Sequence, residues 1–513
     1  MLSQLAALTL LAPLVAGAQQ RPNFLFVLTD DQDVLLGGGL PVMPTLASLA
    51  ARGKRFDRAF TSSPICCPSR TSLFSGRYAH NLDDPQLGWC GNFTRGGEQE
   101  DNFLLGLSSV GYAIGQFGKW FNAESFFSPP YTPSWLAASP TNEFFVMTEE
   151  GVYFNNTWNH NGAAFKSPPG AYLTSVLGNA SVAWLRSVTA GDSPAPWIGY
   201  IAPHAPHLPA TPAPWYADAP LPAQTAPRTP NWNAGWEDKH FQIDNGVDKP
   251  MSPALIAGSD ALWRSRLRSL MSVDDLLREA LAVVAAAGPH TAANTFVLAT
   301  SDHGYHVGQH GVWCEKAGPY DFDARVPLVI AGPGVAPNSS STALVTNIDL
   351  PATLLDLAGA PNGWPTNPGE RRDGTSLAPL LASASSEPPR GWRDRLLIEF
   401  VGWVTPYEWL TPCQFQLGPC GGDNDAGLVN ANSNNYVSLR VQNATADTLF
   451  AEWRPSLAPL VPASTNWTEA YNLTDDPYQM VNIAVKGRAS PAALAAMRDE
   501  LWRVATCVAA TCP

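Results

Sequence analysis

Two cysteines stand side by side in the segment Cys66-Cys67-Pro68-Ser69-Arg70, and a run of small hydroxyl residues surrounds them. Neighbouring cysteines rarely bond to each other, because the disulfide between them is strained. The two cysteines are therefore either ordinary structural cysteines, in a disulfide or in the core, or they supply a reactive group beside Arg70. The five residues alone leave both interpretations open.

Acidic and imidazole side chains follow three apolar runs of the chain. They are Asp30 and Asp31 after residues 23–29, His204 and His207 after residues 196–202, and Asp302 and His303 after residues 295–300. Continuous apolar runs are expected for strands that are buried on both faces of a parallel sheet. Ligands of open α/β sheets gather at the carboxyl ends of the strands, so we expect these side chains to converge.

Strand-like runs alternate with amphipathic helices along the first three quarters of the chain. Strands are expected over residues 23–29, 55–60, 114–119, 196–202, 295–300 and 326–330, and helices over residues 45–52, 172–188 and 260–287, with a further helix from Leu104. This alternation predicts an α/β fold with a mostly parallel sheet flanked by helices. Because 513 residues are too many for one ordinary core, a second, smaller domain is also expected.

The expected domain boundary lies near residue 385. The segment ASASSEPPR at residues 382–390 has the composition of a linker. Strand-like runs at residues 396–401, 436–441 and 449–453 follow it, and a terminal helix is expected over residues 491–505. We therefore expect a catalytic domain at residues 21–384 and a smaller C-terminal α+β domain at residues 385–513.

The composition is that of a globular protein, with 45% hydrophobic and 15% charged residues. The formal net charge of −13 argues against nucleic acid as a partner. It does not exclude a small anionic substrate, because a local cationic pocket can exist in an acidic protein. No run of about 18 apolar residues follows the N-terminal segment, so no membrane span is expected.

The N-terminus has the features of a secretory signal. Residues 5–15 are apolar and are followed by the small residues Ala16-Gly17-Ala18, so residues 1–18 are expected to be a signal peptide. Asn-x-Ser/Thr sequons suit a secreted, cell-wall or lysosomal glycoprotein. They lie at Asn92, Asn155, Asn179, Asn338, Asn443, Asn466 and Asn472.

The eight cysteines fit an oxidising compartment. Cys413 and Cys420, and likewise Cys507 and Cys512, are close enough in sequence to close small loops. The disulfide connectivity does not follow from the sequence.

The segment that begins at Cys66 resembles the Cys-x-Pro-Ser-Arg signature of type I sulfatases. The continuation over residues 71–77, the pair Gly118-Lys119, the segment Asp302-His303-Gly304-Tyr305-His306 and the closing run YNLTDDPYQMVNIA also recur in that family, in the same order. The resemblance covers nearly the whole mature chain. The forms ICCPSR and DHGYHVGQ look closest to the branch that holds N-acetylglucosamine-6-sulfatases, extracellular heparan endosulfatases and algal arylsulfatases.

The resemblance implies an alkaline-phosphatase-like fold and an unusual nucleophile. In these enzymes a formylglycine-generating enzyme oxidises the first cysteine of the motif, so Cys66 is expected to become Cα-formylglycine (3-oxoalanine). Cys67 is then expected to pack as a small apolar residue. One hydroxyl of the hydrated aldehyde attacks sulfur and takes the sulfuryl group, and the other lets the sulfated intermediate collapse and expel sulfate.

The resemblance also assigns roles to the residues at the strand ends. Asp30, Asp31, Asp302, His303 and the modified Cys66 would hold one divalent cation, expected to be Ca²⁺. Arg70 would pair with the acidic cluster, and Lys119 and Lys316 would contact sulfate oxygens. His207 is the candidate for sulfate contact and for protonation of the leaving group, since a pKa near neutral suits that role. His204 is the alternative for the same position.

These expectations describe a secreted sulfatase that acts on a sulfated sugar, such as a 6-sulfated glucosamine unit, or on aryl sulfates. A phosphonate monoester or phosphodiester hydrolase is the alternative enzyme, because relatives use the same nucleophile motif. A catalytically silent glycoprotein that binds sulfated glycan is an alternative from another class. The intact nucleophile, metal and cation set argues against a silent protein.

Overall fold

The computed structural model describes residues 20–82, 98–122, 131–149, 151–191, 195–240, 249–360, 364, 372–400, 434–454, 465–485 and 487–513. The expected signal peptide, the sequon at Asn92 and the cysteine pair Cys413 and Cys420 lie outside these residues. None of the helices in the described part combines the length and the apolar character that a membrane span requires.

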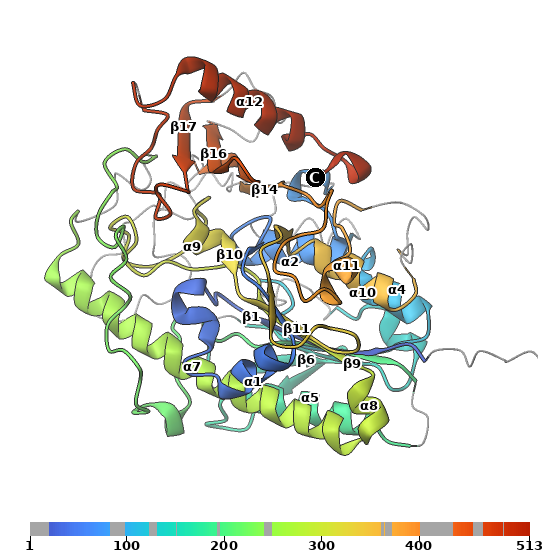
Figure 1. The fold of residues 1–513 in the computed structure, drawn as a ribbon. Helices are drawn as coiled ribbons and strands as arrows, with labels where there is room; N and C mark the ends of the chain where they lie inside the picture. The colour runs from blue at the N-terminus through green and yellow to red at the C-terminus, as the bar shows by residue number, and fades with distance from the viewer. Residues whose placement is uncertain are drawn as a thin grey trace, which may run out of the picture.

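A mixed sheet of ten strands forms the centre of the described structure (Figure 1). Its strands lie in the order β12 (Ser339–Ser341), β2 (Lys54–Phe56), β11 (Leu328–Ala331), β9 (Thr295–Ser301), β1 (Asn23–Thr29), β8 (Trp197–Ala202), β4 (Ala113–Gly118), β5 (Glu143–Met147), β6 (Thr157–His160) and β7 (Ala163–Lys166). From β9 to β5 each strand is parallel to its neighbour, whereas β11, β6 and β7 join antiparallel. β1, β8, β4 and β9 are buried along their whole length, as their continuous apolar sequences predict.

Helices cover both faces of the central sheet (Figure 1). On one side lie α1 (Pro44–Arg52), α5 (Leu173–Val188), α7 (Pro253–Ala286) and α8 (Pro289–Ala293), and on the other lie α2 (Cys66–Ser75), α4 (Phe103–Ser109), α10 (Asp349–Leu357) and α11 (Ala378–Leu381). Each side has its own hydrophobic cluster. Leu25 and Val27 of β1 enter the first cluster and Phe24 and Phe26 enter the second, because successive side chains of a strand point to opposite faces.

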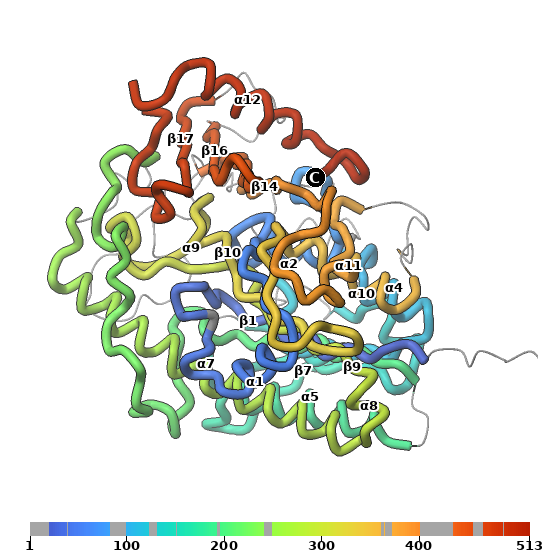
Figure 2. Tube along the Cα trace, in the orientation of Figure 1, coloured from blue at the N-terminus to red at the C-terminus, as the bar shows by residue number. Residues whose placement is uncertain are grey.

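A second sheet lies toward the C-terminus. β14 (Arg395–Phe400), β15 (Asn435–Gln442), β16 (Asp447–Arg454) and β17 (Trp467–Asn472) form an antiparallel sheet, and α12 (Pro491–Ala505) packs on it. This orange and red unit lies over one end of the first part of the chain (Figure 2). Tyr320 and Phe322 of the first part share a hydrophobic cluster with Leu396 and Tyr471 of this sheet. Because this cluster joins the two parts of the chain, the expected domain boundary between residues 384 and 385 remains a prediction.

Two expected strands are each divided in the structure. Residues 55–60 form the end of β2 and, after a turn, β3 (Ala59–Phe60), which lies in a small sheet with β10 (Arg325–Val326) and β13 (Val345–Thr346). Residues 326–330 are divided between β10 and β11 at Pro327, which has no N–H to donate to a ladder. The remaining elements are α9 (Asp321–Ala324) and the short 3-10 helices η1 (Val34–Gly39), η2 (Ala79–Asn81), η4 (Glu98–Glu100), η6 (Ser134–Ala138), η7 (Pro214–Tyr216) and η9 (Ala509–Thr511).

His80 in η2 connects the first part of the chain to the C-terminal sheet. Its Nδ1 lies 2.9 Å from Oε2 of Glu399 in β14, and its Nε2 lies 2.9 Å from the carbonyl oxygen of Cys507. Burial favours the neutral ring, but the charge and hydrogen bond of Glu399 outweigh burial and raise the pKa of His80 to about 9. The disulfide expected between Cys507 and Cys512 is confirmed.

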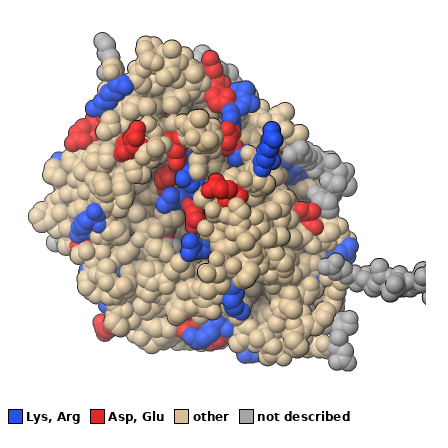
Figure 3. Space-filling model, viewed as in Figure 1, with Lys and Arg blue, Asp and Glu red and all other residues tan. Residues whose placement is uncertain are grey.

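Charged side chains on the surface do not form one acidic field on the face shown in Figure 3. Acidic and basic residues are interspersed there, with wide uncharged areas between them. A denser group of ionisable side chains lies in the interior, where Asp30, Arg70, Lys119 and Asp302 are each no more than 1% exposed.

Candidate active site

Four neighbouring strands of the central sheet end at one edge, and each is followed by side chains of the candidate site. β9, β1, β8 and β4 are adjacent in the sheet. They lead to Asp302 and His303 after β9, Asp30 and Asp31 after β1, His204 and His207 after β8, and Lys119 after β4. The structure brings these side chains together through ion pairs and hydrogen bonds around Asp30 and Asp31.

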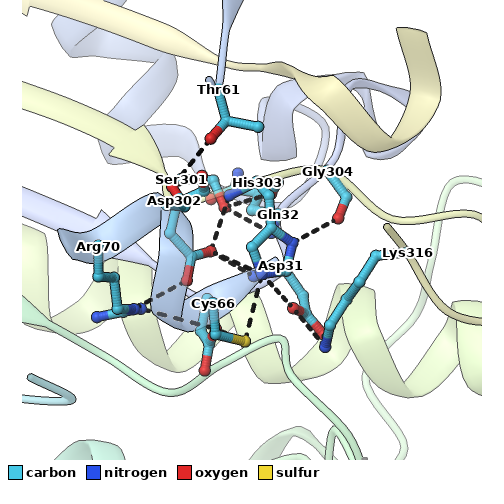
Figure 4. Close-up of polar contacts among 12 residues, drawn as sticks. Asp31, Gln32, Thr61, Cys66, Arg70, Ser301, Asp302, His303, Gly304 and Lys316 are labelled. Carbon is cyan, nitrogen blue, oxygen red and sulfur yellow. Dashed lines mark hydrogen bonds and ion pairs between the residues drawn. The ribbon is translucent and has the colours of Figure 1, made fainter. Parts of the chain in front are cut away.

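Cys66 is the first residue of α2, and all ten residues of this helix are buried. The free Cys66 thiol points into the acidic cluster (Figure 4). Its Sγ lies 3.3 Å from Nε2 of His303 and 3.6 Å from Oδ1 of Asp30. Ser69 links α2 to the residue that follows β9, because its hydroxyl donates to the carbonyl oxygen of Asp302 at 2.5 Å.

The expectation that Cys67 packs as a free apolar residue is wrong, because Cys67 is disulfide-bonded. It is completely buried. Successive residues of a helix project about 100° apart, so Cys67 faces a different side of α2 from Cys66 and forms a disulfide without involving it. Only one thiol of the pair is therefore left for chemistry.

Buried cations balance the carboxylates of the site. Arg70 Nε lies 2.9 Å from Oδ2 of Asp302, and Lys119 Nζ lies 2.8 Å from Oδ2 of Asp30. Lys316 Nζ lies 3.1 Å from Oδ1 of Asp31. Burial alone would raise the pKa of Asp30, but the charge of Lys119 and the other neighbouring cations hold it well below its usual value. Asp30 is therefore ionised although it is completely buried.

The backbone of Asp31 is held in an uncommon conformation by a residue that the sequence analysis did not identify. Asp31 has a φ of 69°, in the left-handed region. Nη2 of Arg266 in α7 donates to the carbonyl oxygen of Asp31 at 2.6 Å and to Oδ2 of Asp33 at 2.5 Å. The sequence held one signal of this role, since Arg266 lies on the buried face of a helix beside Leu267 and Leu270.

Four of these residues can hold a metal ion. Asp30, Asp31, Cys66 and His303 each offer one ligand atom, and these atoms all lie within 4.8 Å of one another. Oδ1 of Asp31 is buried and accepts no hydrogen bond from the described residues, although Lys316 lies close to it. Two buried carboxylates, one of them with an oxygen that has no donor, fit a hard cation.

Asp302 lies beside this group rather than within it. Its Oδ1 accepts the backbone N–H groups of Asp31 and His303 at 3.1 and 2.9 Å, and its Oδ2 is paired with Arg70. The same Oδ1 lies 3.6 Å from Nε2 of His303. Burial lowers the pKa of His303, but the charge of Asp302 and the contact with Cys66 outweigh it and raise that pKa to about 9.

The two histidines after β8 differ in how the protein uses their ring nitrogens. Nδ1 of His204 lies 2.9 Å from Oδ2 of Asp30, and its Nε2 accepts the N–H of Gly151 at 3.3 Å. Burial and the charge of His207 lower the pKa of His204 to about 4. His207 instead donates from Nδ1 to its neighbour's carbonyl oxygen, that of Leu208, at 2.8 Å. The centres of the two rings lie 4.4 Å apart.

Lys316 is presented by a turn that another carboxylate secures. Glu315 and Ala317, on either side of it, have positive φ values of 110° and 82°, which side-chain-bearing residues rarely adopt. Oδ2 of Asp323 accepts the N–H of Gly318 at 2.8 Å. Oδ1 of the same carboxylate lies 2.8 Å from the ring nitrogen Nδ1 of His306. The backbone N–H of His306 donates in turn to the carbonyl oxygen of Glu315. Asp323 therefore fixes both sides of the turn that carries Lys316.

Comparison with other sequences identifies relatives along nearly the whole chain. A sequence model of the Sulfatase family matches residues 22–360. The N-acetylglucosamine-6-sulfatase of Homo sapiens is 33% identical over 506 residues, which cover 97% of this chain and 87% of that protein. An arylsulfatase of Volvox carteri is 29% identical over 512 residues, which cover 93% of this chain and 73% of the relative.

Solved structures share the fold. The structure of a protein in complex with its substrate D-glucosamine-2-N,6-O-disulfate has a TM-score of 0.70 at 20% identity, over 94% of this chain and 96% of the other. The phosphonate monoester hydrolase of Silicibacter pomeroyi has a TM-score of 0.64 at 20% identity, over 94% of both chains. The expected α/β architecture is thus confirmed. By its sequence relatives, the chain belongs to the sulfatase family and is an enzyme that hydrolyses sulfate esters.

Proposed function

We propose that this sulfatase removes sulfate from a sulfated sugar of the 6-sulfated glucosamine class, with an oxidised Cys66 as its nucleophile. The observation that carries the proposal is the buried Cys66 thiol, which points at Asp30 and His303 from the start of α2. The sugar class is supported by 33% identity to a protein named N-acetylglucosamine-6-sulfatase over 97% of the chain. Aryl sulfates are the second substrate class, supported by the name of the Volvox relative.

The nucleophile would be formed from Cys66 by a formylglycine-generating enzyme that binds the chain transiently. The hydrated aldehyde would supply one hydroxyl to attack sulfur and a second to release sulfate afterwards. Cys66 is suited to this role because the neighbouring Cys67 is bonded in a disulfide, so the Cys66 thiol stays available. The Cys66 thiol also contacts two ionisable side chains of the site, Asp30 and His303.

One Ca²⁺ ion would be held by Asp30, Asp31, Asp302, His303 and the modified Cys66, and a different divalent cation is the alternative. When bound, the cation would neutralise charge on the sulfate and lower the pKa of the attacking hydroxyl. The donors fit such an ion, since the buried Asp31 Oδ1 has no hydrogen-bond donor among the described residues.

The remaining residues would bind sulfate and move one proton. Lys119 and Lys316 would pair with sulfate oxygens, and Arg70 would hold Asp30 and Asp302 in place with its buried guanidinium. His207 would contact sulfate and protonate the leaving alcohol. We favour it over His204, because both ring nitrogens of His204 already bond to Asp30 and Gly151.

The protein would reach this active form in the secretory pathway. A signal peptide at residues 1–18, sequons and a disulfide between Cys507 and Cys512 are consistent with export. A relative from Drosophila melanogaster that is 33% identical over 398 residues is named an extracellular sulfatase. We propose a secreted or cell-wall glycoprotein, with the lysosome as the alternative destination.

Two measurements test the proposed function. Mass spectrometry of the peptide that contains residues 61–70 should show formylglycine in place of Cys66 in protein from its native host. Rates should then be compared for N-acetylglucosamine 6-sulfate, 4-nitrophenyl sulfate, a 4-nitrophenyl phosphodiester and a phosphonate monoester.

The expected result is rapid release of sulfate and slow cleavage of both phosphorus esters. Faster phosphorus-ester cleavage would instead support the alternative hydrolase. A biological effect that persists in Cys66→Ala would support a silent glycan-binding protein. Cys314→Ala is the matched control, because Cys314 is also a buried cysteine and has no part in the proposed mechanism.

A further inference from the structure

A groove of about 820 Å³ runs along α5, on the face of the central sheet opposite to α2. Its lining is mostly apolar, and two of its aromatic side chains are unusually accessible. Trp215 is 59% exposed and Phe165 is 39% exposed. Exposed apolar surfaces of this kind mark sites that another molecule covers.

Neighbouring rings hold both aromatic side chains in defined positions. The Trp215 ring lies edge-on to Tyr172, with 6.0 Å between the ring centres. The Phe165 ring lies 5.7 Å from that of Phe145. The exposed rings are therefore fixed walls of the groove rather than loose surface residues, and the polar pair Glu143 and His160 adds hydrogen-bonding groups to the lining.

Asn179 lies on the helix face that lines the groove. Val176, Asn179, Ala183 and Ser187 follow one another at spacings of three and four residues, which places them on one side of α5. Asn179 is exposed and begins the sequon Asn179-Ala180-Ser181. Its side chain makes no hydrogen bond to any described residue.

Other sequon asparagines have a different setting. Asn155 accepts the N–H of Gly170 at 2.7 Å, and the Nδ2 groups of Asn443 and Asn472 donate to Asp394 and Asp475. Among the described sequons, Asn179 thus combines a side chain without a hydrogen bond and a position inside an apolar groove.

We propose that an N-linked glycan on Asn179 lies in this groove and covers Phe165 and Trp215 with its N-acetylglucosamine core. This inference rests on the proposed passage through the secretory pathway and not on the catalytic mechanism. A pyranose ring offers a face of C–H groups to the aromatic walls and hydroxyl and amide groups to water and to the polar lining. The volume of the groove is within the range of about 300–1,000 Å³ that is typical of small-molecule sites.

Attachment has to precede packing of α5. The Ser181 hydroxyl donates to the carbonyl oxygen of Leu177 at 2.9 Å and is completely buried in the folded helix. The donor is a polyprenyl diphosphate oligosaccharide. Nδ2 of Asn179 forms a bond to C1 of the first sugar and loses one proton, while the bond from C1 to the diphosphate breaks and lipid diphosphate leaves. The groove would then form around the attached sugar as the helix packs.

Protection of the attached glycan from enzymatic release tests the proposal. The full chain is expressed in a glycosylating eukaryotic host, and the folded protein is digested with a peptide N-glycosidase. Site-resolved mass spectrometry then measures the release of glycan from Asn179 and from the exposed Asn466. We expect Asn179 to be glycosylated and its glycan to be released at least about tenfold more slowly than in the denatured protein, whereas release at Asn466 changes little.

The double variant F165A/W215A provides the matched control. Both side chains are exposed and neither belongs to the proposed catalytic machinery, so the variant should keep its sulfatase activity, which checks that it folds. Protection at Asn179 should disappear in this variant, and N179Q should bind more of an apolar dye than N466Q.

Three results would overturn the proposal. They are an unmodified Asn179 beside a glycosylated Asn443 or Asn466, equal release from folded and denatured protein, and protection that persists without the two aromatic rings. A chain without any glycan would overturn the proposed secretory route as well, whereas the other outcomes leave that route and the catalytic proposal intact.

Discussion

The ion pair between His80 and Glu399 makes the stability of this enzyme depend on pH in a predictable direction. The perturbation is His80→Gln, which removes the charge. His80 has only 6% of its side chain exposed and Glu399 only 1%, so solvent screens their attraction little. The bond joins η2 to the C-terminal sheet, and the variant should therefore lose stability there first.

The magnitude follows from the pKa of His80, which rises from 6.5 to about 9 in the folded protein. At about 1.4 kcal/mol for each unit of pKa, this increase corresponds to about 3 kcal/mol. Because the folded-state pKa is the higher one, the stabilisation is complete below about pH 6.5. It declines as the pH rises toward 9 and is lost above that value.

The assay is urea unfolding of the wild type and of His80→Gln between pH 6 and pH 9.5. The free energy of unfolding of the wild type should exceed that of the variant by about 3 kcal/mol more at pH 6 than at pH 9.5. His290→Gln, which changes an exposed histidine in α8, should give a profile parallel to the wild type. Parallel profiles for wild type and His80→Gln would refute the reasoning, because the imidazolium would then contribute nothing to folding.

The remaining predictions concern the active site. Cys66→Ala should lower the rate of sulfate release by about 10³-fold or more while the thermal unfolding temperature changes little, and equal loss in Cys314→Ala would contradict the assigned nucleophile. Lys316→Ala should cost about 10²-fold in kcat/KM. Asp323→Asn should lower kcat/KM by about tenfold. It should lower kcat/KM no further in a protein that already carries Lys316→Ala, because Asp323 acts by positioning that lysine. Additive losses in this double-mutant cycle would exclude the positioning role of Asp323. Dialysis against a chelator should abolish activity and Ca²⁺ should restore it, with Asp31→Asn needing about tenfold more Ca²⁺ for half-maximal recovery; activity that survives chelation would count against a metal held by these carboxylates.

The edge of the sheet at which the site lies was predictable from the sequence because the signals are local. The runs over residues 23–29, 196–202 and 295–300 are apolar throughout, and each ends in acidic or imidazole residues. Such runs form central parallel strands, whose carboxyl ends share one edge. The helix expected over residues 491–505 has these same bounds in the structure, because Ser490 caps it and Pro491 begins it.

Contacts between distant segments were not predictable in the same way. The Arg266 guanidinium reaches Asp31 from a helix 235 positions away, and the sequence marks Arg266 only as a charge on an apolar helix face. Cys67 bonds elsewhere although its neighbour stays free, because the direction of each side chain depends on the helix that α2 forms. His80 and Glu399 are 319 residues apart and meet only through the packing of the C-terminal sheet.

Because the whole of α2 is buried, a modifying enzyme can reach Cys66 only before this part of the chain folds. Cys66 is 1% exposed, and Ser69 and Arg70 near it are no more accessible. A second protein therefore cannot bind this segment once the helix is packed. Under the proposed mechanism, oxidation of Cys66 would then have to precede folding of this segment, and a molecule that folds with an unmodified cysteine would stay inactive. The specific activity of a preparation would then depend on the fraction of chains in which Cys66 was oxidised during synthesis. Later addition of the oxidising enzyme to the purified, folded protein would not raise that activity.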